Sequence, residues 1–314
     1  MPDVALGWSN RLKVARGGQG VVAHAGVVLP RLLADRVGLT AGLRAVVARQ
    51  GFTPRRDRGR LLTDAVAALA AGASCLLDVE ALTRQEALFG PGGAASDTTV
   101  LRALDELADR IGDDGLPERR YARMLAGVRA TAWAAIVAGN QGLLPAVQVA
   151  RRPLARSGTG EPVTVIRVDA TIIEAATCKE PSVTGHYKHG IGWHPLTAWC
   201  SNTDDHLAVM QRPGNAGSFT ASDHVLVLDA ALEQVPAPHR RDVLVTIDGA
   251  GASHDVIDHL TGLNTFKEHG RRGRRVEYTI GWPVDARTRT SIEEVPEQAW
   301  TARIDPNGDV APDR

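Results

Sequence analysis

Two runs of β-branched and aliphatic residues, each of which contains an aspartate, most strongly constrain the fold of this chain. The first covers residues 163–175 and carries Asp169 in its middle, and the second covers residues 243–254 and carries Asp248 before a glycine-rich exit. The first run is typical of a strand buried on both faces of a sheet. Because a buried carboxylate needs a cationic partner, we expect the two aspartates to converge on one divalent metal ion.

A second interpretation of each aspartate is structural. An aspartate at the end of a strand is often a helix N-cap or a turn residue, and the sequence Asp248-Gly249 suits a turn. This interpretation remains open for either run taken alone. The same sequence context in both runs favours the metal site.

Bulk composition limits the classes of protein to consider. A length of 314 residues predicts two domains, and 44% hydrophobic with 23% charged residues is typical of a soluble globular protein. The three cysteines have neither metal-site spacing nor the numbers of a disulfide framework, which favours a reduced, intracellular protein. We find no signal-peptide pattern and no apolar run long enough to span a membrane.

Charge is distributed unevenly although the net charge is zero. Residues 1–160 hold 21 Arg and Lys against 14 Asp and Glu, whereas residues 161–314 hold 15 against 22. A basic front half and an acidic back half suit a nucleic-acid-binding module joined to a metal-binding one. Chance scatter in an arginine-rich chain is the alternative.

The front half has the periodicity of helices. Apolar residues recur at helical spacing over residues 27–37, 39–47, 61–77, 96–107 and 121–137. The helix–glycine–helix pattern around Gly38 is similar to a helix-turn-helix, which would contact DNA, although most such segments only pack. A basic loop before residue 61 supplies candidate DNA-binding side chains, namely Arg55, Arg56, Arg58 and Arg60.

The back half alternates strands and helices. After residues 163–175 come a polar loop or hairpin at 179–189, strands at 194–200 and 207–211, a helix at 222–233, the second aspartate strand, a helix at 253–260 and a strand at 277–282. This order predicts an α/β fold with a mixed sheet, a ribonuclease-H-like core, preceded by a mainly helical N-terminal region. We expect the helical region to cover residues 1–155 and the core residues 160–283.

The chemistry expected of the core is that of a hard cation. Mg²⁺ takes oxygen ligands, often one or two carboxylates together with phosphate oxygens. Gly249 and Gly251 would leave room beyond Asp248 for a phosphate backbone, or simply make a turn. Lys188 and the nearby histidines form a polar segment that is solvated or faces DNA phosphate; zinc is not expected, because no cysteine or carboxylate stands at structural-site spacing.

Short motifs in both halves resemble one known family. Those of the back half are Val168-Asp-Ala-Thr171, Tyr187-Lys-His-Gly190, His194-Pro-Leu196, Arg212-Pro-Gly-Asn-Ala216 and Thr246-Ile-Asp-Gly-Ala-Gly251. Those of the front half are Val22-Ala-His-Ala-Gly26, Leu33-Ala-Asp-Arg-Val-Gly-Leu-Thr40 and Ser96-Asp-Thr-Thr-Val-Leu101. Together they cover almost the whole chain, which resembles bacterial DDE transposases, most closely the insertion-sequence thirteen-eighty family.

The resemblance implies a function, a cofactor and partners. It implies metal-dependent cutting and insertion of DNA with Mg²⁺, for which Mn²⁺ can substitute, and it matches Asp169 and Asp248 to the first two catalytic, metal-binding acids of the family. The implied partners are double-stranded DNA, as the terminal inverted repeats of the element and as target, and further copies of the chain in a homo-oligomer. The implied location is the cytoplasm, in association with the nucleoid.

The third acid of the family is a glutamate that follows a β-rich insertion. Residues 284–314 look like the start of that insertion, so we expect the third acid to be missing and the chain to be truncated and inactive. Three functions compete: a transposase or a truncated copy of one, a DNA-binding remnant that competes with intact transposase, and a metal-dependent nuclease unrelated to transposition. Metal-dependent cleavage and joining of element ends would separate them.

Overall fold

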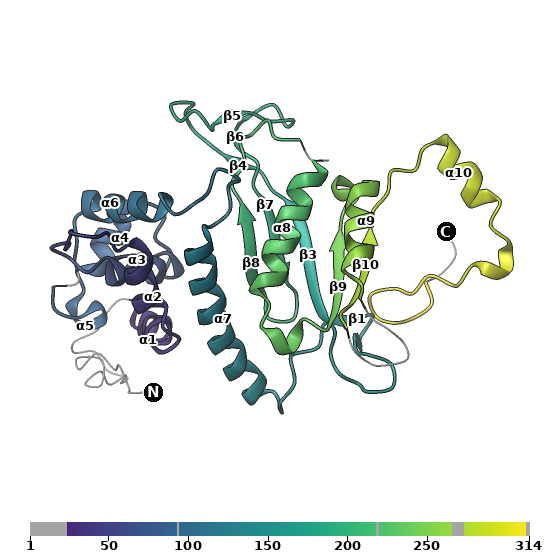
Figure 1. Cartoon of the computed structure of the whole chain (residues 1–314), viewed down its shortest axis with the longest axis horizontal. Helices are drawn as coiled ribbons and strands as arrows, with labels where there is room; N and C mark the ends of the chain where they lie inside the picture. The colour runs from purple at the N-terminus through teal and green to yellow at the C-terminus, as the bar shows by residue number, and fades with distance from the viewer. Residues whose placement is uncertain (1–23, 93, 218–219, 266–272, 312–314) are drawn as a thin grey trace. The chain divides into compact units, whose positions relative to one another are not determined.

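The computed structural model describes residues 24–92, 94–217, 220–265 and 273–311 (Figure 1). The first two residues of the motif at 22–26 lie outside the described residues. The chain divides into two compact units, one of residues 1–113 with 117–132 and the other of residues 114–116 with 133–314. The division falls inside helix α7 (Arg119–Gly139), upstream of the boundary near residue 155 that the sequence suggests.

The first unit is helical, as predicted. Its elements are η2 (Ala25–Val27), α1 (Val28–Arg36), α2 (Leu39–Val47), α3 (Arg58–Ala70), α4 (Leu76–Thr83), α5 (Glu86–Phe89), α6 (Asp97–Ala108) and the first turns of α7. Gly38 separates α1 from α2 with φ of 84°, a left-handed conformation that glycine adopts without strain. The helix–glycine–helix pattern is therefore confirmed as structure.

Two details of the helical unit differ from the expectation. Residues 61–77 are not one helix, because α3 ends at Ala70 and the chain turns through Gly72 (φ of 102°) before α4 begins. Several leucines and valines of these apolar, helically spaced runs are exposed: Leu29, Leu33, Val66, Leu69, Leu77, Leu101 and Leu104. Small residues of α3, among them Gly59, Ala65 and Ala68, are buried instead. Gly59 lies against α2, because a Cβ there would be 2.1 Å from the carbonyl oxygen of Thr40.

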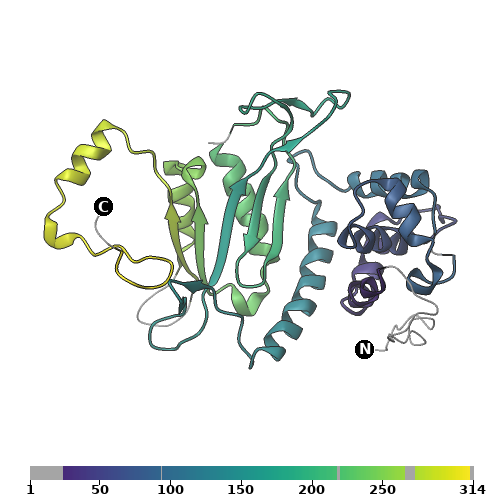
Figure 2. The same cartoon turned by 180° about the vertical axis from the view of Figure 1, so that it is seen from behind.

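The second unit is built on a mixed five-stranded sheet in the order β10-β9-β3-β7-β8 (Figures 1 and 2). Its strands are β3 (Thr164–Ala170), β7 (Leu196–Cys200), β8 (Asp205–Met210), β9 (Asp242–Ile247) and β10 (Arg275–Ile280). β3, β7 and β8 form an antiparallel meander, and β9 and β10 lie parallel to β3. Helices α8 (Ala221–Gln234) and α9 (His254–Leu263) fall between the strands in sequence, which confirms the predicted α/β order.

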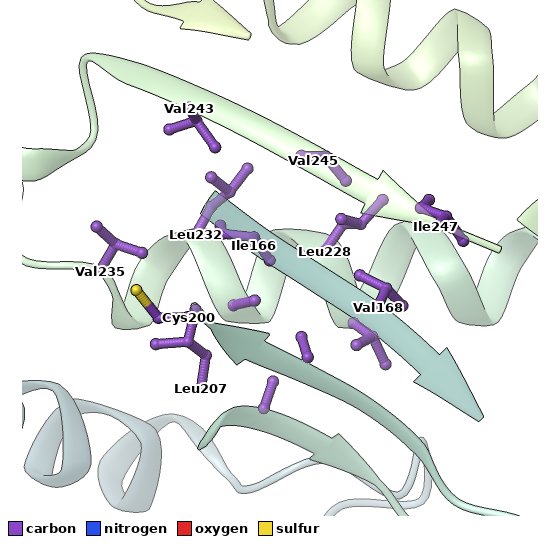
Figure 3. Close-up of a cluster of buried hydrophobic side chains, with 14 of the residues drawn as sticks. Ile166, Val168, Cys200, Leu207, Leu228, Leu232, Val235, Val243, Val245 and Ile247 are labelled. Atoms are coloured by element: carbon purple, nitrogen blue, oxygen red, sulfur yellow. The ribbon is translucent and has the colours of Figure 1, made fainter. Parts of the chain in front are cut away.

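The core of the second unit lies on one face of this sheet. Side chains of β3, β7 and β9 meet those of α8 there, among them Ile166, Val168, Val245, Leu228 and Leu232 (Figure 3). On the other face Arg167 and Asp169 are exposed, and Figure 2 shows the strands from that side with the helices behind them. The prediction that this strand is buried on both faces holds only at its start, where Val165 on this face is 4% exposed, and is wrong from Arg167 onward.

Smaller elements complete the unit. A three-stranded sheet in the order β4-β6-β5 joins β4 (Ile173–Glu174), β6 (Ile191–Trp193) and β5 (Thr184–Gly185), and a two-stranded ribbon joins β1 (Gln148–Val149) and β2 (Arg152–Pro153). Short 3₁₀ helices are η3 (Ala237–His239), η4 (Gly249–Gly251) and η5 (Glu297–Ala299). The segment expected to begin a β-rich insertion instead forms helix α10 (Ala286–Glu293), η5 and one bridge between Ile304 and Val310. No described helix is long and apolar enough to cross a membrane.

Candidate metal centre

Asp169 is the last residue but one of β3, and Asp248 directly follows the last residue of the adjacent parallel strand β9. The register of β3 with β9 pairs Val168 with Ile247, so each aspartate is the next residue along the chain from this pair. Neighbouring strands are about 4.8 Å apart and laterally adjacent residues of parallel strands share a face. Ile247 and Val168 point into the core, so both aspartates point to the opposite, open face, where both are exposed.

Both aspartates line one cleft of about 720 Å³ on this face. The lining residues are Arg167, Val168, Asp169, Thr171, Thr197, Trp199, Asp204, Thr246, Ile247 and Asp248. Asp204 belongs to the turn that leads into β8 and thus lies toward the opposite end of the strands. Among the described residues, no group of three or more His, Cys, Asp or Glu side chains is placed to hold a metal ion.

The backbone around each aspartate is held by its neighbours. The Thr197 hydroxyl, across from Asp169 in the antiparallel register, donates a 2.9 Å hydrogen bond to the Asp169 carbonyl oxygen. Asp248 opens the 3₁₀ turn η4, in which the Gly251 amide donates to the Asp248 carbonyl oxygen at 3.1 Å. These contacts position the two main chains and leave the carboxylates facing the cleft.

The glycines after Asp248 have two different roles. A Cβ at Gly249 would meet nothing within 4 Å. The space on this side of the residue after Asp248 is therefore open, which is one of the two roles that the sequence suggested for Gly249. A Cβ at Gly251 would lie 2.2 Å from Cγ2 of Ile247 and 3.4 Å from the His224 ring. Gly251 is therefore required for packing of the turn against the core, which supports the second of the two roles that the sequence left open for it.

Two buried side chains that sequence reasoning did not select support this end of the sheet. His224 is buried on α8 beside the η4 turn, and its Nδ1 lies 3.0 Å from the Thr220 carbonyl oxygen. Burial lowers the pKa of its imidazole, and this effect outweighs the hydrogen bond to Thr220 and the charges of Asp223 and Asp248, which raise it. The only sequence signal was a histidine on the apolar face of a helix.

Arg212 ties together three segments near the cleft. Its Nε donates to the His194 carbonyl oxygen at 2.9 Å and its Nη1 to a carboxylate oxygen of Asp223 at the same distance. The exit of β8, the loop before β7 and the first turn of α8 thus meet on one buried guanidinium. The motifs at 194–196 and 212–216, which the sequence analysis quoted for the family resemblance, make these structural contacts.

Lys188 lies at the tip of the hairpin between β5 and β6. Its amide donates to Nδ1 of buried His186, and its Nζ lies 5.6 Å from the centre of the exposed Tyr187 ring. His189 adopts a left-handed φ of 66°, and His194 is buried with Nδ1 3.0 Å from the Ala216 carbonyl oxygen. The hairpin therefore presents an ammonium and an aromatic ring to solvent.

The four arginines of the predicted basic loop divide into two pairs. Arg58 and Arg60 belong to α3: Arg58 makes two hydrogen bonds to the Glu106 carboxylate, at 2.8 and 3.0 Å, and Arg60 donates to the Phe89 carbonyl oxygen. Arg55 and Arg56 are exposed, and Arg56 donates to the Gly92 carbonyl oxygen. The side chains of Arg55 and Arg56 are thus the more available to a DNA phosphate.

Comparison with known proteins identifies the family of this chain. A family model described as transposase DDE domain group 1 matches residues 4–311. The chain belongs to this family of DDE transposases. In this transposase chain the open cleft with its two aspartates therefore lies within the matched domain.

Individual proteins are more distant. The piggyBac transposase in a synaptic complex with hairpin DNA is 11% identical with a TM-score of 0.39, over 87% of this chain and 52% of that chain. The Mos1 transposase in a paired-end complex with the left transposon end is 13% identical with a TM-score of 0.25, over 74% of this chain and 60% of that chain. The chain thus spans less than two thirds of the length of either protein. No curated protein matches it.

Proposed function

We propose that this chain carries a ribonuclease-H-like catalytic core that binds the DNA ends of an insertion element, of the insertion-sequence thirteen-eighty type, and serves metal-dependent cleavage and strand transfer. The observation that carries the proposal is the placement of Asp169 beside Asp248 at the ends of adjacent parallel strands, in one open cleft. Family membership and the sheet order β10-β9-β3-β7-β8 support it. DNA is the proposed partner, and a homo-oligomer the proposed working form.

The donor set fits a hard divalent cation. Two exposed carboxylates supply oxygen ligands, and Mg²⁺ commonly uses one or two carboxylates together with water and substrate phosphate oxygens. Asp169 and Asp248 would hold Mg²⁺, or Mn²⁺ in its place. When bound, the ion would stabilise negative charge on a phosphate and activate the attacking oxygen.

The residues of the chain itself provide position and access. Thr197 holds the main chain of Asp169, and the η4 turn holds that of Asp248. The absence of a side chain at Gly249 lets a phosphate approach the two carboxylates. Arg55, Arg56 and Lys188 are the proposed contacts to DNA phosphate.

The competing proposal is a DNA-binding chain without chemistry, which would compete with intact transposase. Two carboxylates at the ends of β3 and β9, with no third His, Cys, Asp or Glu grouped with them among the described residues, favour testing this alternative directly. Both proposals include metal binding at the aspartates and differ in whether DNA is cut. Incubating the purified chain with element-end DNA and Mg²⁺ or Mn²⁺ decides between them: nicked or joined products support the enzyme, and binding without products supports the competitor.

Metal binding is tested by the melting temperature. Mg²⁺ should raise it in the unaltered chain, because a ligand that binds only the native state adds about 1–3 kcal/mol of stability at ten to a hundred times its dissociation constant. The increase should vanish in Asp169→Asn and in Asp248→Asn. Asp204→Asn is the matched control, since Asp204 lines the same cleft away from the pair. A shift that survives both substitutions places the metal elsewhere and overturns the proposal.

A further inference from the structure

Side chains on the open face of the sheet lie in two rows across the strands. The strand registers place Asp169 and Thr197 in the first row, with Asp248 just past the end of β9. They place Thr246, Arg167, Trp199 and His206 in the second row. Successive residues on one face of a strand are about 6.7 Å apart, so the second row lies one such step from the aspartates. Thr246, Arg167 and Trp199 line the same cleft as the aspartates. The cleft therefore holds Asp169 and Asp248 at one end, and Arg167 and Trp199, with Asp204 in the turn before β8, toward the other.

Trp199 is held in one orientation. Its indole Nε1 donates to the Thr197 hydroxyl oxygen at 3.2 Å, and that hydroxyl donates to the carbonyl oxygen of Asp169. On the other side its ring lies against His206, with centroids 4.5 Å apart and planes tilted by 54°. The side chain is nevertheless 39% exposed. A large aromatic ring is thus fixed in the cleft with part of its surface facing solvent.

Arg167 lies directly across from Trp199 in the β3–β7 register. Its side chain is exposed, and no described residue forms an ion pair or hydrogen bond with it. An exposed guanidinium with no anionic partner among the residues that the structure describes is suited to a phosphate, which it binds with two parallel hydrogen bonds. The aromatic ring and the cation are therefore neighbours on one side of the aspartates.

An aromatic ring beside a guanidinium, as at Trp199 and Arg167, is suited to bind an unpaired nucleotide. An exposed aromatic ring stacks on any base, with little sequence preference, and an adjacent arginine holds the backbone phosphate. A base inside a duplex is stacked on its neighbours and cannot offer its face, so the nucleotide must be single-stranded or turned out of the helix. An apolar protein segment could pack on the Trp199 ring but would leave the Arg167 guanidinium without an anionic partner. A nucleotide offers both a base and a phosphate.

We propose that Trp199 and Arg167 form a subsite for one unpaired nucleotide next to the Asp169–Asp248 pair, with the base on the indole and its phosphate on the guanidinium. The inference rests on the proposed function, because it places DNA in the same cleft. It adds the requirement that the nucleotide beside the acidic pair be unpaired.

The test measures binding of a fluorescein-labelled oligothymidine and of a blunt duplex to the full chain by fluorescence anisotropy. Trp199→Ala should weaken oligothymidine binding about tenfold or more, whereas Trp199→Phe should keep most of the affinity. Both variants should bind the blunt duplex as the unaltered chain does. Trp300→Ala is the matched control, because Trp300 is exposed outside the cleft. Arg167→Gln should lower the slope of log affinity against log salt for the oligothymidine by about 0.7.

Three results would overturn the subsite. They are unchanged oligothymidine binding in Trp199→Ala, an equal loss for oligothymidine and blunt duplex, and loss of self-association in that variant without nucleic acid, which would make this face a contact between copies. Failure of the proposed function is seen separately in the Mg²⁺ melting shift. Trp199→Ala should retain that shift, which also shows that the variant is folded.

Discussion

Arg31 is the most deeply buried charged residue of the helical unit, with a side chain that is 1% exposed. Its Nε lies 2.5 Å from a carboxylate oxygen of Asp64, which is also buried, and its Nη1 lies 2.7 Å from Asp35. Burial raises the pKa of Asp64 to about 6, because loss of solvent outweighs the attraction of Arg31. Arg31 thus joins α1 to α3 while Asp64 carries a cost for being ionised.

Removing Arg31 should destabilise the chain strongly. Arg31→Met leaves the Asp64 carboxylate buried, with only Arg60 nearby at 3.6 Å, and should lower the free energy of unfolding by about 3–5 kcal/mol. The loss should shrink at pH 5. Arg31 lowers the pKa of Asp64, so removing it raises that pKa further above its ordinary value. The variant therefore gains more stability than the unaltered chain as pH falls and Asp64 becomes protonated. Urea denaturation at pH 7.5 and pH 5 measures both effects.

The control for this change is an ion pair in solvent. Arg49 and Asp109 are 2.7 Å apart with side chains 46% and 62% exposed, so Arg49→Met should cost less than about 1 kcal/mol. A similar loss in both variants, or a loss in Arg31→Met that does not depend on pH, would contradict the role assigned to the buried pair.

At the scale of the element, the turn η4 sets the position of Asp248. Gly251→Ala places a methyl group 2.2 Å from Cγ2 of Ile247, a buried β-branched side chain that cannot move aside. The variant should lose about 1–3 kcal/mol of stability and most of the Mg²⁺ melting shift, because the turn and Asp248 must move together. Thermal denaturation with and without Mg²⁺ measures both.

Gly249→Ala tests whether that effect is specific. It makes the same chemical change two residues earlier, where a Cβ meets nothing within 4 Å, so the melting temperature should stay nearly constant. Equal destabilisation by the two substitutions would show that the backbone conformation of the turn, and not the contact with Ile247, requires the glycine at 251.

At the scale of the whole molecule, the uneven charge predicts where DNA binds. Residues 1–160 carry a net charge of +7 and residues 161–314 a net charge of −7. Reversing Arg55 and Arg56 to Glu should weaken duplex binding and lower its log–log salt slope by about 0.9 for each lost phosphate contact. Reversing Arg287 and Arg289 on α10, which are also exposed, makes the same change of net charge in the acidic half.

Electrophoretic mobility shifts over a series of salt concentrations compare the two double variants. The Arg55 and Arg56 variant should show the larger loss, and the α10 variant should bind nearly as the unaltered chain does. Equal losses would mean that net charge alone governs binding and that the basic loop is no particular DNA contact. Arg58 is unsuitable for this test because its loss would leave Glu106 without its partner.

The sequence by itself determined the order of elements and the two aspartates. Periods of about 3.6 and 2 residues are properties of neighbouring residues, so the helices of the front half and the meander, helix and strand order of the back half could be predicted. Asp169 and Asp248 stood out because each follows an apolar run, and their matching contexts already indicated a common site. The sequence placed Asp248 at the end of its strand but Asp169 in the middle of the run 163–175, whereas β3 ends at Ala170, one residue after Asp169.

Only the tertiary structure decided which face of the sheet is open and which charged groups are engaged. Asp169 is exposed because α8 and α9 pack on the opposite face of the sheet. The sequence of β3 alone does not show which of its faces the helices cover. Arg58 binds Glu106, 48 residues away in sequence, and thus is less available to DNA. Trp199 neighbours Arg167 through strand register, which long-range pairing sets. Burial and pairing depend on residues distant in the chain, and local periodicity does not record them.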